Sequence, residues 1–379
     1  MSSLRSFIAP YYRNLRGWRT KRKIVVFESD DWGSIRMPSR EVYKKCLKAG
    51  YPVDRNPYEK FDSLESKNDL ELLFEILSKF TDQQGNHPII TANCLVANPD
   101  FEKIKESGYQ SYFYERVTET FKRTPSTDRG FDLWQEGQDK GVFKMQFHGR
   151  EHLNVGLFMR ALQAGNDDLL FAFDLGMPGI MSKSNGNTGN NLVEATYFRT
   201  PEDKLDILDA MLDGLDIFEE LMGFKSTSLI PPNYTWSIDY DEAVGQKGVK
   251  YFQGYRKIRE PQMNGNAPLY HTYYLGQKNL NGQLYLIRNA SFEPTLTAVS
   301  SDAINTCLRE VSAAFAMGKP AIVSTHRINY MGSIFPANRD ANLKLLKRLL
   351  VQLKSRWPEV EFMASNTLGD LISGSIKKH

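Results

Sequence analysis

Short apolar runs alternate along the chain with longer amphipathic segments. The short runs are rich in Val, Ile, Leu and Phe and are bounded by turn-forming or charged residues, a pattern that is typical of buried strands. Strands are therefore predicted at residues 24–28, 88–96, 142–147, 226–230, 251–255, 283–288, 321–324 and 360–363. The longer segments repeat their apolar residues at helical spacing. Helices are predicted at residues 64–80, 201–222, 303–317 and 341–353.

The order of these elements predicts the fold class. Repeats of strand, helix and strand favour parallel strands joined by right-handed crossovers, and the number of strands suits an α/β barrel. An open, doubly wound sheet is the alternative. We expect a basic N-terminal arm over residues 1–23 and a single domain over residues 24–379, with insertions around residues 97–141 and 160–200. Within the second insertion, the polar, Gly-rich stretch 182–191 is expected to be a surface loop.

Composition and charge narrow the class of protein. Hydrophobic residues make up 41% of the 379 residues and charged residues 25%, as in ordinary globular proteins. The formal net charge of +3 is too small to indicate a partner nucleic acid. Basic residues concentrate in the N-terminal arm, which suits weak contact with an anionic membrane surface, although a solvated arm is the simpler interpretation. The composition does not indicate an oligomeric state.

The three cysteines bear on the compartment. They lie far apart, their number is odd, and no Cys-x-x-Cys pair occurs, so neither a disulfide framework nor a thiolate zinc site is indicated. The N-terminus also lacks an apolar run of signal-peptide length. We therefore expect a cytoplasmic protein.

The residues that could bind a metal or transfer protons lie at or directly after the ends of predicted strands, where the active sites of α/β proteins form. Asp30 and Asp31 follow the first strand, and two adjacent carboxylates there are unfavourable unless a cation or a proton offsets them. His148 and His152 follow the third strand, and histidines four residues apart can share a tetrahedral metal ion. His326 ends the run AIVSTH and, because histidine titrates near neutral pH, is a candidate general acid.

The same five residues from His148 to His152 match the H-x-x-E-H signature of inverted zinc peptidases. In that interpretation Glu151 is the general base. The signature requires a helix through the whole motif, whereas here it follows a strand at once and Gly149 disfavours a helix. A zinc peptidase is therefore the second hypothesis.

Further residues near the strand ends are candidates for contact with a substrate. Aromatic side chains can stack on sugar rings, and exposed backbone N–H groups can hold an oxyanion. Core packing is the alternative for the aromatic residues. The candidates are Trp32, Asn233, Tyr234, Trp236, Arg150 and Arg288.

Taken in order, the motifs resemble those of the polysaccharide deacetylase family, also called the NodB-homology or carbohydrate esterase 4 group. The matching pieces are Ser29-Asp30-Asp31, His148-x-x-x-His152, Pro231-Pro232-Asn233-Tyr234 and Val323-Ser-Thr-His326. The resemblance implies a distorted (β/α)7-8 barrel, here with added loops and helices. It also implies a divalent metal ion on Asp31, His148 and His152, with Asp30 as the base and His326 as the acid. A backbone N–H near Asn233 or Tyr234 would help to hold the oxyanion.

The chain departs from the family pattern in two motifs. Family members carry an Arg in the Pro-rich motif that orients the base, and Ile230 stands at the nearest place here. Arg150, Arg288 and Arg327 are three candidates to replace it. The family's Trp-containing motif is not recognisable.

The function expected from the sequence is metal-dependent removal of an N- or O-linked acetyl group from a carbohydrate or polysaccharide precursor. Zn²⁺ is the metal expected for a His₂Asp site, and Co²⁺, Ni²⁺ or Mn²⁺ could occupy the same ligands. A zinc peptidase and a non-catalytic carbohydrate-binding protein on the same barrel are the alternatives.

Overall fold

A computed structural model describes residues 2–183, 191–297 and 300–376. Residues 184–190, the larger part of the predicted surface loop 182–191, lie outside the described residues. None of the helices in the described part of the chain is long and apolar enough to span a membrane.

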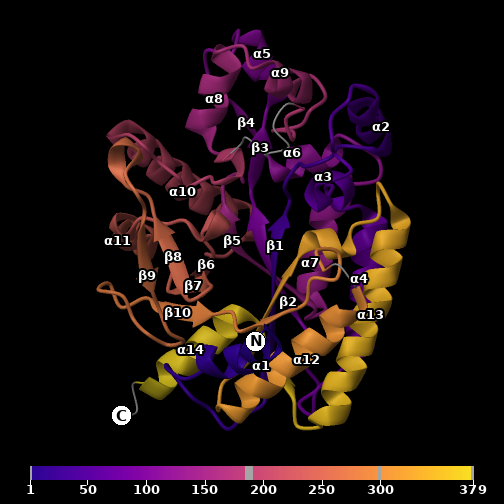
Figure 1. The fold of residues 1–379 in the computed structure, drawn as a ribbon, viewed down its shortest axis with the longest axis vertical. Coiled ribbons are helices and arrows are strands. Elements are labelled where there is room, and N and C mark those ends of the chain that lie inside the picture. Colours follow the sequence, from indigo (N-terminus) through magenta and orange to yellow (C-terminus); the bar gives the residue numbers. More distant parts are fainter. Residues whose placement is uncertain (1, 184–190, 298–299, 377–379) are drawn as a thin grey trace.

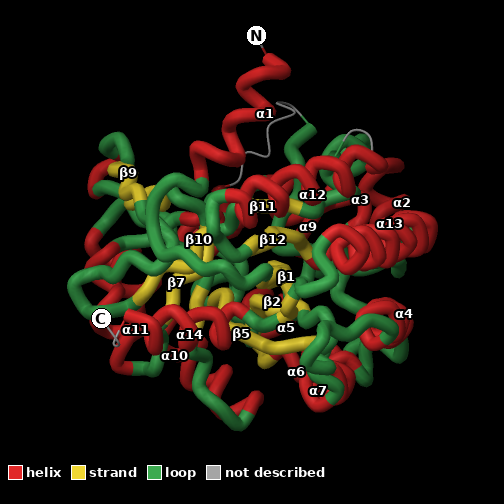
Figure 2. Tube along the Cα trace, turned by 90° about the horizontal axis from the view of Figure 1, so that it is seen from below, coloured by secondary structure: helices red, strands yellow, loops and turns green. Residues whose placement is uncertain are grey.

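A curled sheet of parallel strands forms the centre of the molecule (Figures 1 and 2). Its strands are β1 (Ile24–Trp32), β2 (Ile90–Leu95), β5 (Phe143–Gly149), β6 (Ser228–Leu229), β7 (Tyr251–Gly254), β10 (Leu284–Ile287), β11 (Ala290–Ser291), β12 (Ala321–His326) and β13 (Glu361–Phe362). Their order is β10-β7-β6-β5-β2-β1-β12-β11, and β13 pairs with β1. The end strands β10 and β11 do not pair with each other, so the barrel is incomplete. Every predicted strand is present, and the predicted α/β barrel is confirmed in this distorted form.

Helices surround the sheet (Figure 2). The α-helices are α1 (Ser2–Arg13), α2 (Arg40–Lys48), α3 (Pro57–Phe61), α4 (Lys67–Ser78), α5 (Phe101–Glu106), α6 (Val117–Lys122), α7 (Gly130–Asp139), α8 (Val155–Gln163), α9 (Asp167–Phe173), α10 (Pro201–Met222), α11 (Asp241–Gln246), α12 (Ser300–Ala316), α13 (Pro336–Arg356) and α14 (Ser365–Ile376). Short 3-10 turns are η1 (Asn191–Val193), η2 (Pro232–Tyr234), η3 (Ile238–Tyr240), η4 (Met263–Gly265) and η5 (Arg327–Tyr330). The four predicted helices correspond to α4, α10, α12 and α13.

Local chemistry sets the ends of these helices. Helix α4 begins later than its apolar pattern because Ser66 and Asp69 form a capping box, each side chain accepting a hydrogen bond from the other residue's backbone. Helix α10 has the predicted bounds. The Thr200 side chain caps its start, and Gly223, at φ 76°, ends it in the left-handed conformation that glycine tolerates.

The sheet is buried by apolar side chains on both faces. Residues Ile24 to Phe27 of β1 are almost completely buried, as are the apolar residues of β2, β5 and β12. Parallel strands covered on both sides are expected to consist of nearly continuous apolar runs. This is why the strands were visible in the sequence.

The predicted N-terminal arm is folded against the domain over much of its described length. Asn14 is buried and accepts a hydrogen bond from the Asn289 side chain at 2.8 Å. The Trp18 indole donates to the Ser375 hydroxyl, also at 2.8 Å. Arg22 pairs with Glu361 of β13. Several polar groups of the arm are thus bonded to the domain. Contact of the arm with a membrane stays a prediction.

Most of the two predicted insertions lies beyond the carboxyl ends of the central strands, whereas α7 packs beside the sheet against β5 (Figure 1). The first contains an antiparallel pair, β3 (Ala97–Pro99) and β4 (Tyr114–Arg116), together with α5, α6 and α7. The second contains α9 and follows α8, and a separate apolar cluster, which includes Ile104, Phe158 and Phe173, joins it to α5. A second antiparallel pair, β8 (Lys257–Glu260) and β9 (Leu269–Thr272), was not predicted. The two insertions, apart from α7, form a cap over the strand ends.

Candidate metal centre

The two adjacent carboxylates of β1 both face one cavity, although successive residues of a regular strand point to opposite faces. The cause is a local irregularity. Asp31 has a φ of 77°, and the register between β1 and β2 shifts between Ser29 and Trp32. A positive φ is unfavourable for a residue with a side chain, and such strain is typical of functional sites. The distortion brings Asp30 and Asp31 to the same side.

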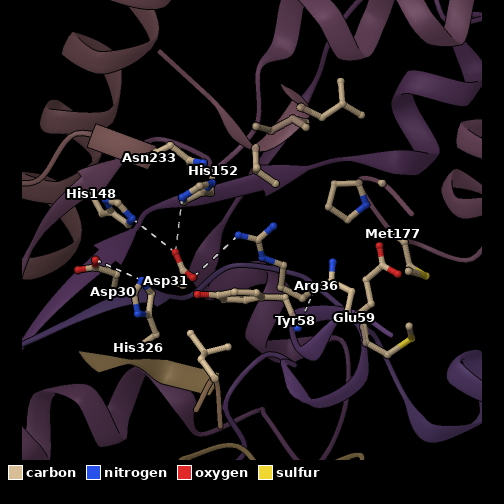
Figure 3. Close-up of a pocket in the computed structure, with 18 of the residues that line it drawn as sticks. Asp30, Asp31, Arg36, Tyr58, Glu59, His148, His152, Met177, Asn233 and His326 are labelled. Carbon is tan, nitrogen blue, oxygen red and sulfur yellow. Dashed lines mark hydrogen bonds and ion pairs between the residues drawn. The ribbon is translucent and has the colours of Figure 1, made fainter. Parts of the chain in front are cut away.

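The two histidines after β5 approach Asp31 from the neighbouring part of the sheet (Figure 3). The Nε2 atoms of His148 and His152 lie 3.5 and 3.6 Å from Asp31 Oδ1. His148 belongs to β5, and His152 lies in a bend after Gly149, whose φ is 135°. His148 Nδ1 lies 2.9 Å from the Ile230 carbonyl, to which it donates. This bond directs the lone pair of Nε2 towards Asp31.

These three side chains fit a metal ion. One ligand atom from each lies within 4.8 Å of the others. The two Asp31–histidine separations are too long for hydrogen bonds, and they match the separation of about 3.4 Å that tetrahedral bonds of about 2.1 Å produce between ligand atoms. A carboxylate and two imidazoles suit Zn²⁺ and its neighbours in the first transition series.

The surroundings of Asp31 and His152 keep these two residues in the protonation states that bind a metal. Burial lowers the pKa of His152 to about 3, so its imidazole is neutral. Burial works to raise the pKa of Asp31, but interactions with His148, His152 and Arg36 outweigh it and hold that pKa well below its ordinary value. Asp31 is therefore ionised.

Asp30 is held by a buried arginine. Arg288 donates from Nη2 to Asp30 Oδ1 at 2.6 Å and from Nη1 to Oδ2 at 2.7 Å. Asn93 donates to Oδ1 at 2.7 Å. Burial opposes ionisation, yet Arg288 outweighs it and lowers the pKa of Asp30 to about 2. Of the three arginines that the sequence offered, Arg150, Arg288 and Arg327, Arg288 is the one that pairs with Asp30.

His326 lies beside Asp30 because the parallel register of β1 and β12 pairs these two residues. Its Nε2 is 3.7 Å from Asp30 Oδ2, and its Nδ1 lies 2.6 Å from Glu293 Oε1. Asn329 donates to the other oxygen of Glu293 at 2.7 Å. Burial works to lower the pKa of His326, but the Glu293 carboxylate outweighs it and raises that pKa to about 10. The imidazole is therefore protonated and can donate from Nε2.

The cavity that holds these groups has a volume of about 550 Å³. The strand-end residues form one wall, which we call the strand wall: Asp30, Asp31, His148, His152 and His326. The opposite wall comes from connecting segments and short helices, and we call it the loop wall: Arg36, Asn56, Tyr58, Glu59 and residues 177–180 (Figure 3). Asn233 and Tyr234 also line the cavity.

The two tryptophans predicted to contact substrate belong to the core, so these predictions are wrong. Trp32 is completely buried, packs edge-on against Phe143 and donates to the Ser29 hydroxyl. Trp236 is 2% exposed, and its indole donates to Asp241 at 2.8 Å. Both indoles have internal partners, and neither ring has a free face for a sugar.

The two predicted substrate-binding arginines also have other roles. Arg288 is completely buried behind Asp30, where it cannot reach a substrate. Arg150 faces a separate cavity, where it pairs with Glu151 and Asp213. These predictions are wrong because the side chains of both residues are fully engaged by neighbouring carboxylates.

Asn233 and Tyr234 lie where the sequence predicted, at the mouth of the cavity. Both have positive φ, 52° and 53°. The Tyr234 hydroxyl accepts from Arg288 Nη1 at 3.2 Å. The Tyr234 N–H donates to the Pro231 carbonyl at 3.0 Å, which leaves Asn233 as the better candidate for an oxyanion donor.

The structure does not provide the arrangement that a zinc peptidase of the H-x-x-E-H type requires. The motif runs from β5 into a bend and is not a helix. Both carboxylate oxygens of Glu151 accept hydrogen bonds from Arg150, at 2.7 and 3.0 Å. Glu151 faces the separate cavity and does not line the one that holds Asp31, His148 and His152.

Several residues of the site could not be assigned from the sequence. Glu293 follows a predicted strand, which was a weak signal, but its pairing with His326 depends on the fold. Asn93 lies inside a strand, and Arg36, Tyr58 and Glu59 lie in connecting segments without a recognisable pattern. Arg36, Tyr58 and Glu59 are far in sequence from His148 and His152.

No family model matches the chain, and no curated protein matches its sequence. Solved structures do match. A putative polysaccharide deacetylase from Mycobacterium smegmatis is 10% identical with a TM-score of 0.43, covering 95% of this chain and 93% of that one. PuuE allantoinase is 11% identical with a TM-score of 0.47, covering 93% and 91%. A putative glycoside hydrolase/deacetylase from Parabacteroides distasonis is 9% identical with a TM-score of 0.48, covering 94% and 72%. Polysaccharide deacetylases recur among the similar structures, and at this low identity the case for a function rests on the geometry of the site.

Proposed function

We propose that the protein is a metal-dependent hydrolase that removes an N- or O-linked acetyl group from a carbohydrate or polysaccharide precursor. One observation carries this proposal. The ligand set of Asp31, His148 and His152 shares a cavity with an ionised carboxylate, Asp30, and a protonated imidazole, His326. A metal, a base and an acid are the groups that hydrolysis of an amide or ester requires.

The residues around the metal ligands divide the work of proton transfer. A divalent ion would polarise the acyl carbonyl and acidify a water molecule enough for a base as weak as Asp30 to accept its proton. Arg288 holds Asp30 ionised and fixes both of its oxygens. His326 would donate the proton on Nε2 to the departing nitrogen or oxygen, with Glu293 fixing the ring through Nδ1. The acid and the base thus lie side by side in the cavity, with His326 Nε2 3.7 Å from Asp30 Oδ2.

The test is metal content together with release of acetate. Protein purified without a His-tag would be analysed for Zn, Co, Ni and Mn, in the wild type, in His148→Ala and in the control His271→Ala. His271 is paired with Glu260 on β8 and does not line the cavity. We expect about one equivalent of metal in the wild type and in the control, and almost none in His148→Ala. Acetate release from an acetylated glycan is expected in the wild type and in the control, and is expected to be lost in His148→Ala together with the metal.

The decisive contrary result would be full acetate release by rigorously metal-free protein. The non-catalytic hypothesis makes a different prediction, namely binding of a glycan without release of acetate. Its motive was the missing base-orienting arginine, and the ion pair between Arg288 and Asp30 removes that motive.

A further inference from the structure

Three largely buried arginines surround the cavity, and they differ in how their donors are used. Arg288 donates to Glu28, Asp30, Tyr234 and Ser324. Arg327 donates to Asp62, Glu65 and the Ser34 carbonyl. Arg36, whose side chain is only 15% exposed, makes no hydrogen bond within the described residues, and its Nε is buried without a partner. The donors of Arg36 are therefore left for another acceptor.

The carboxylates around Arg36 do not accept hydrogen bonds from it. Arg36 Nη2 is 3.9 Å from Asp31 Oδ2, and its Nε is 3.8 Å from Asp62 Oδ2. Both oxygens of Asp62 already accept from Arg327, at 3.1 and 3.0 Å. Asp31 directs its other oxygen, Oδ1, towards the two histidines, and its Oδ2 is too far from Arg36 for a hydrogen bond. Glu59 accepts from the Met181 N–H, and burial raises its pKa to about 7, so it carries only part of a negative charge near neutral pH.

The position of Arg36 is fixed by its neighbours in the chain. The Ile35 N–H donates to the Asn98 side chain at 2.9 Å, and the Met37 N–H donates to the Asp62 carbonyl at 3.2 Å. Met37 is completely buried. The backbone on both sides of Arg36 is therefore held in place, while the donors of its guanidinium stay unbonded. These unsatisfied donors are available to a ligand in the cavity.

The guanidinium projects into the cavity beside the metal ligands. Figure 3 shows it next to Asp31, on the side away from Asp30 and His326 and towards Glu59 and Met177. It thus lies opposite the acid that serves the leaving group. Buried donors without acceptors are costly, and a guanidinium presents its N–H groups in a plane that matches a carboxylate or a phosphate.

We propose that Arg36 binds an oxyanion carried by the substrate, so that the protein acts on an acidic acylated sugar in preference to a neutral one. This inference rests on the proposed function, because it names the substrate class of the same site. The oxyanion is a carboxylate or a phosphate close to the acyl group, since Arg36 lies within 3.9 Å of a metal ligand.

The experiment compares three probes on the metal-loaded protein: N-acetylglucosamine, its 3-O-carboxymethyl ether and its 3-phosphate, in which the anion is next to the acetamido group. Binding would be measured by calorimetry, and acetate release would be measured in parallel. The variants are Arg36→Gln, Arg36→Lys and the control Arg129→Gln. Arg129 is an exposed arginine that directly precedes α7, pairs with Glu136 and does not line the cavity. Metal content and thermal unfolding verify that each variant is folded.

We expect the wild type to bind one of the acidic sugars about 10- to 100-fold more tightly than the neutral sugar, which is the range for one charge-assisted contact. Arg36→Gln should abolish this preference, Arg36→Lys should keep part of it, and Arg129→Gln should keep all of it; the quantity compared is the ratio of acidic to neutral sugar, because Arg36 also lies near Asp31. The acid that is preferred distinguishes a carboxylate from a phosphate. Equal binding of all three sugars, or a preference that survives in Arg36→Gln, would overturn the inference.

The two proposals fail in different ways. Acetate release from the neutral and acidic sugars at equal rates would support the hydrolase and overturn the role of Arg36. An Arg36-dependent preference in binding, without acetate release from any of the sugars, would support the anion site and count against the hydrolase.

Discussion

The strand wall and the loop wall of the cavity differ in how completely their charged groups are partnered. On the strand wall, Arg288 grips both oxygens of Asp30, and Glu293 holds His326. On the loop wall, Arg36 has no hydrogen-bond partner within the described residues, and one oxygen of Glu59 is buried without one. Both walls are parts of the same cavity.

This difference separates two tasks. Groups that act on the reacting atoms must be held rigidly before the substrate arrives, because reorganising them during the reaction costs rate. Groups that recognise the substrate must keep some of their hydrogen-bonding capacity free. The strand wall should therefore govern the rate for every substrate, whereas the loop wall should govern which substrate is bound. Changes on the two walls are expected to differ in kind as well as in size.

The largest effect is expected for Arg288→Met. The substitution leaves Glu28 and Asp30 buried without their cation, and removing one partner of a buried ion pair costs about 3–5 kcal/mol of stability. Acetate release should be lost as well, because Asp30 is no longer oriented. Urea unfolding would measure the stability, with Arg116→Met as the control, since Arg116 forms an exposed pair with Glu220. A stable, fully active Arg288→Met protein would show that Arg288 does not orient Asp30 for the reaction.

Asp30→Asn should lower kcat without removing the metal. The loss of a general base costs about 10²- to 10⁴-fold in rate, and the three proposed metal ligands are untouched by this change. Steady-state kinetics and elemental analysis on the same sample would measure both quantities. If the metal disappeared together with the activity, Asp30 would be a ligand and the assignment of roles within the strand wall would be wrong.

Glu293→Gln should change the pH dependence of the reaction. His326 can act as an acid only while it is protonated, so kcat should fall as the pH rises through its pKa of about 10. Removing the Glu293 charge leaves burial to lower that pKa, and the fall in kcat should move to lower pH. The profile of kcat against pH between the wild type and the variant would measure the displacement. An unmoved alkaline limb would show that His326 is not the acid.

The smallest effect is expected for Glu151→Gln. Glu151 lies between the two candidate metal-ligating histidines in the sequence but faces Arg150 and the separate cavity. Acetate release and metal content should stay close to those of the wild type. The peptidase hypothesis requires the opposite result, a loss of all activity, so this variant separates the two interpretations of one motif.

Arg36→Gln supplies the matching test on the loop wall. Its effect should depend on the substrate, unlike that of every change on the strand wall. An equal loss of rate for neutral and acidic sugars would mean that the two walls do not divide the work.

The sequence alone determined the strands and the candidates for the metal centre. Buried parallel strands consist of continuous apolar runs, so β1, β2, β5 and β12 were recognisable, and Asp31, His148 and His152 could be placed at strand ends without any knowledge of the packing. Residues that lie within a few positions of a clear strand inherit its location. Their approach to one another follows from the parallel arrangement of the sheet.

Only the tertiary structure decided the partners and the burial of the other side chains. Arg288 meets Asp30 across 258 residues of sequence, and no local pattern distinguishes it from Arg150 or Arg327. Trp32 and Trp236 are of a residue type that commonly stacks on sugar rings, but here the core encloses both of them. The physical reason is that hydrogen bonding and burial depend on which surfaces meet in three dimensions. The absence of a hydrogen-bond acceptor for Arg36 within the described residues is likewise visible only in the folded chain.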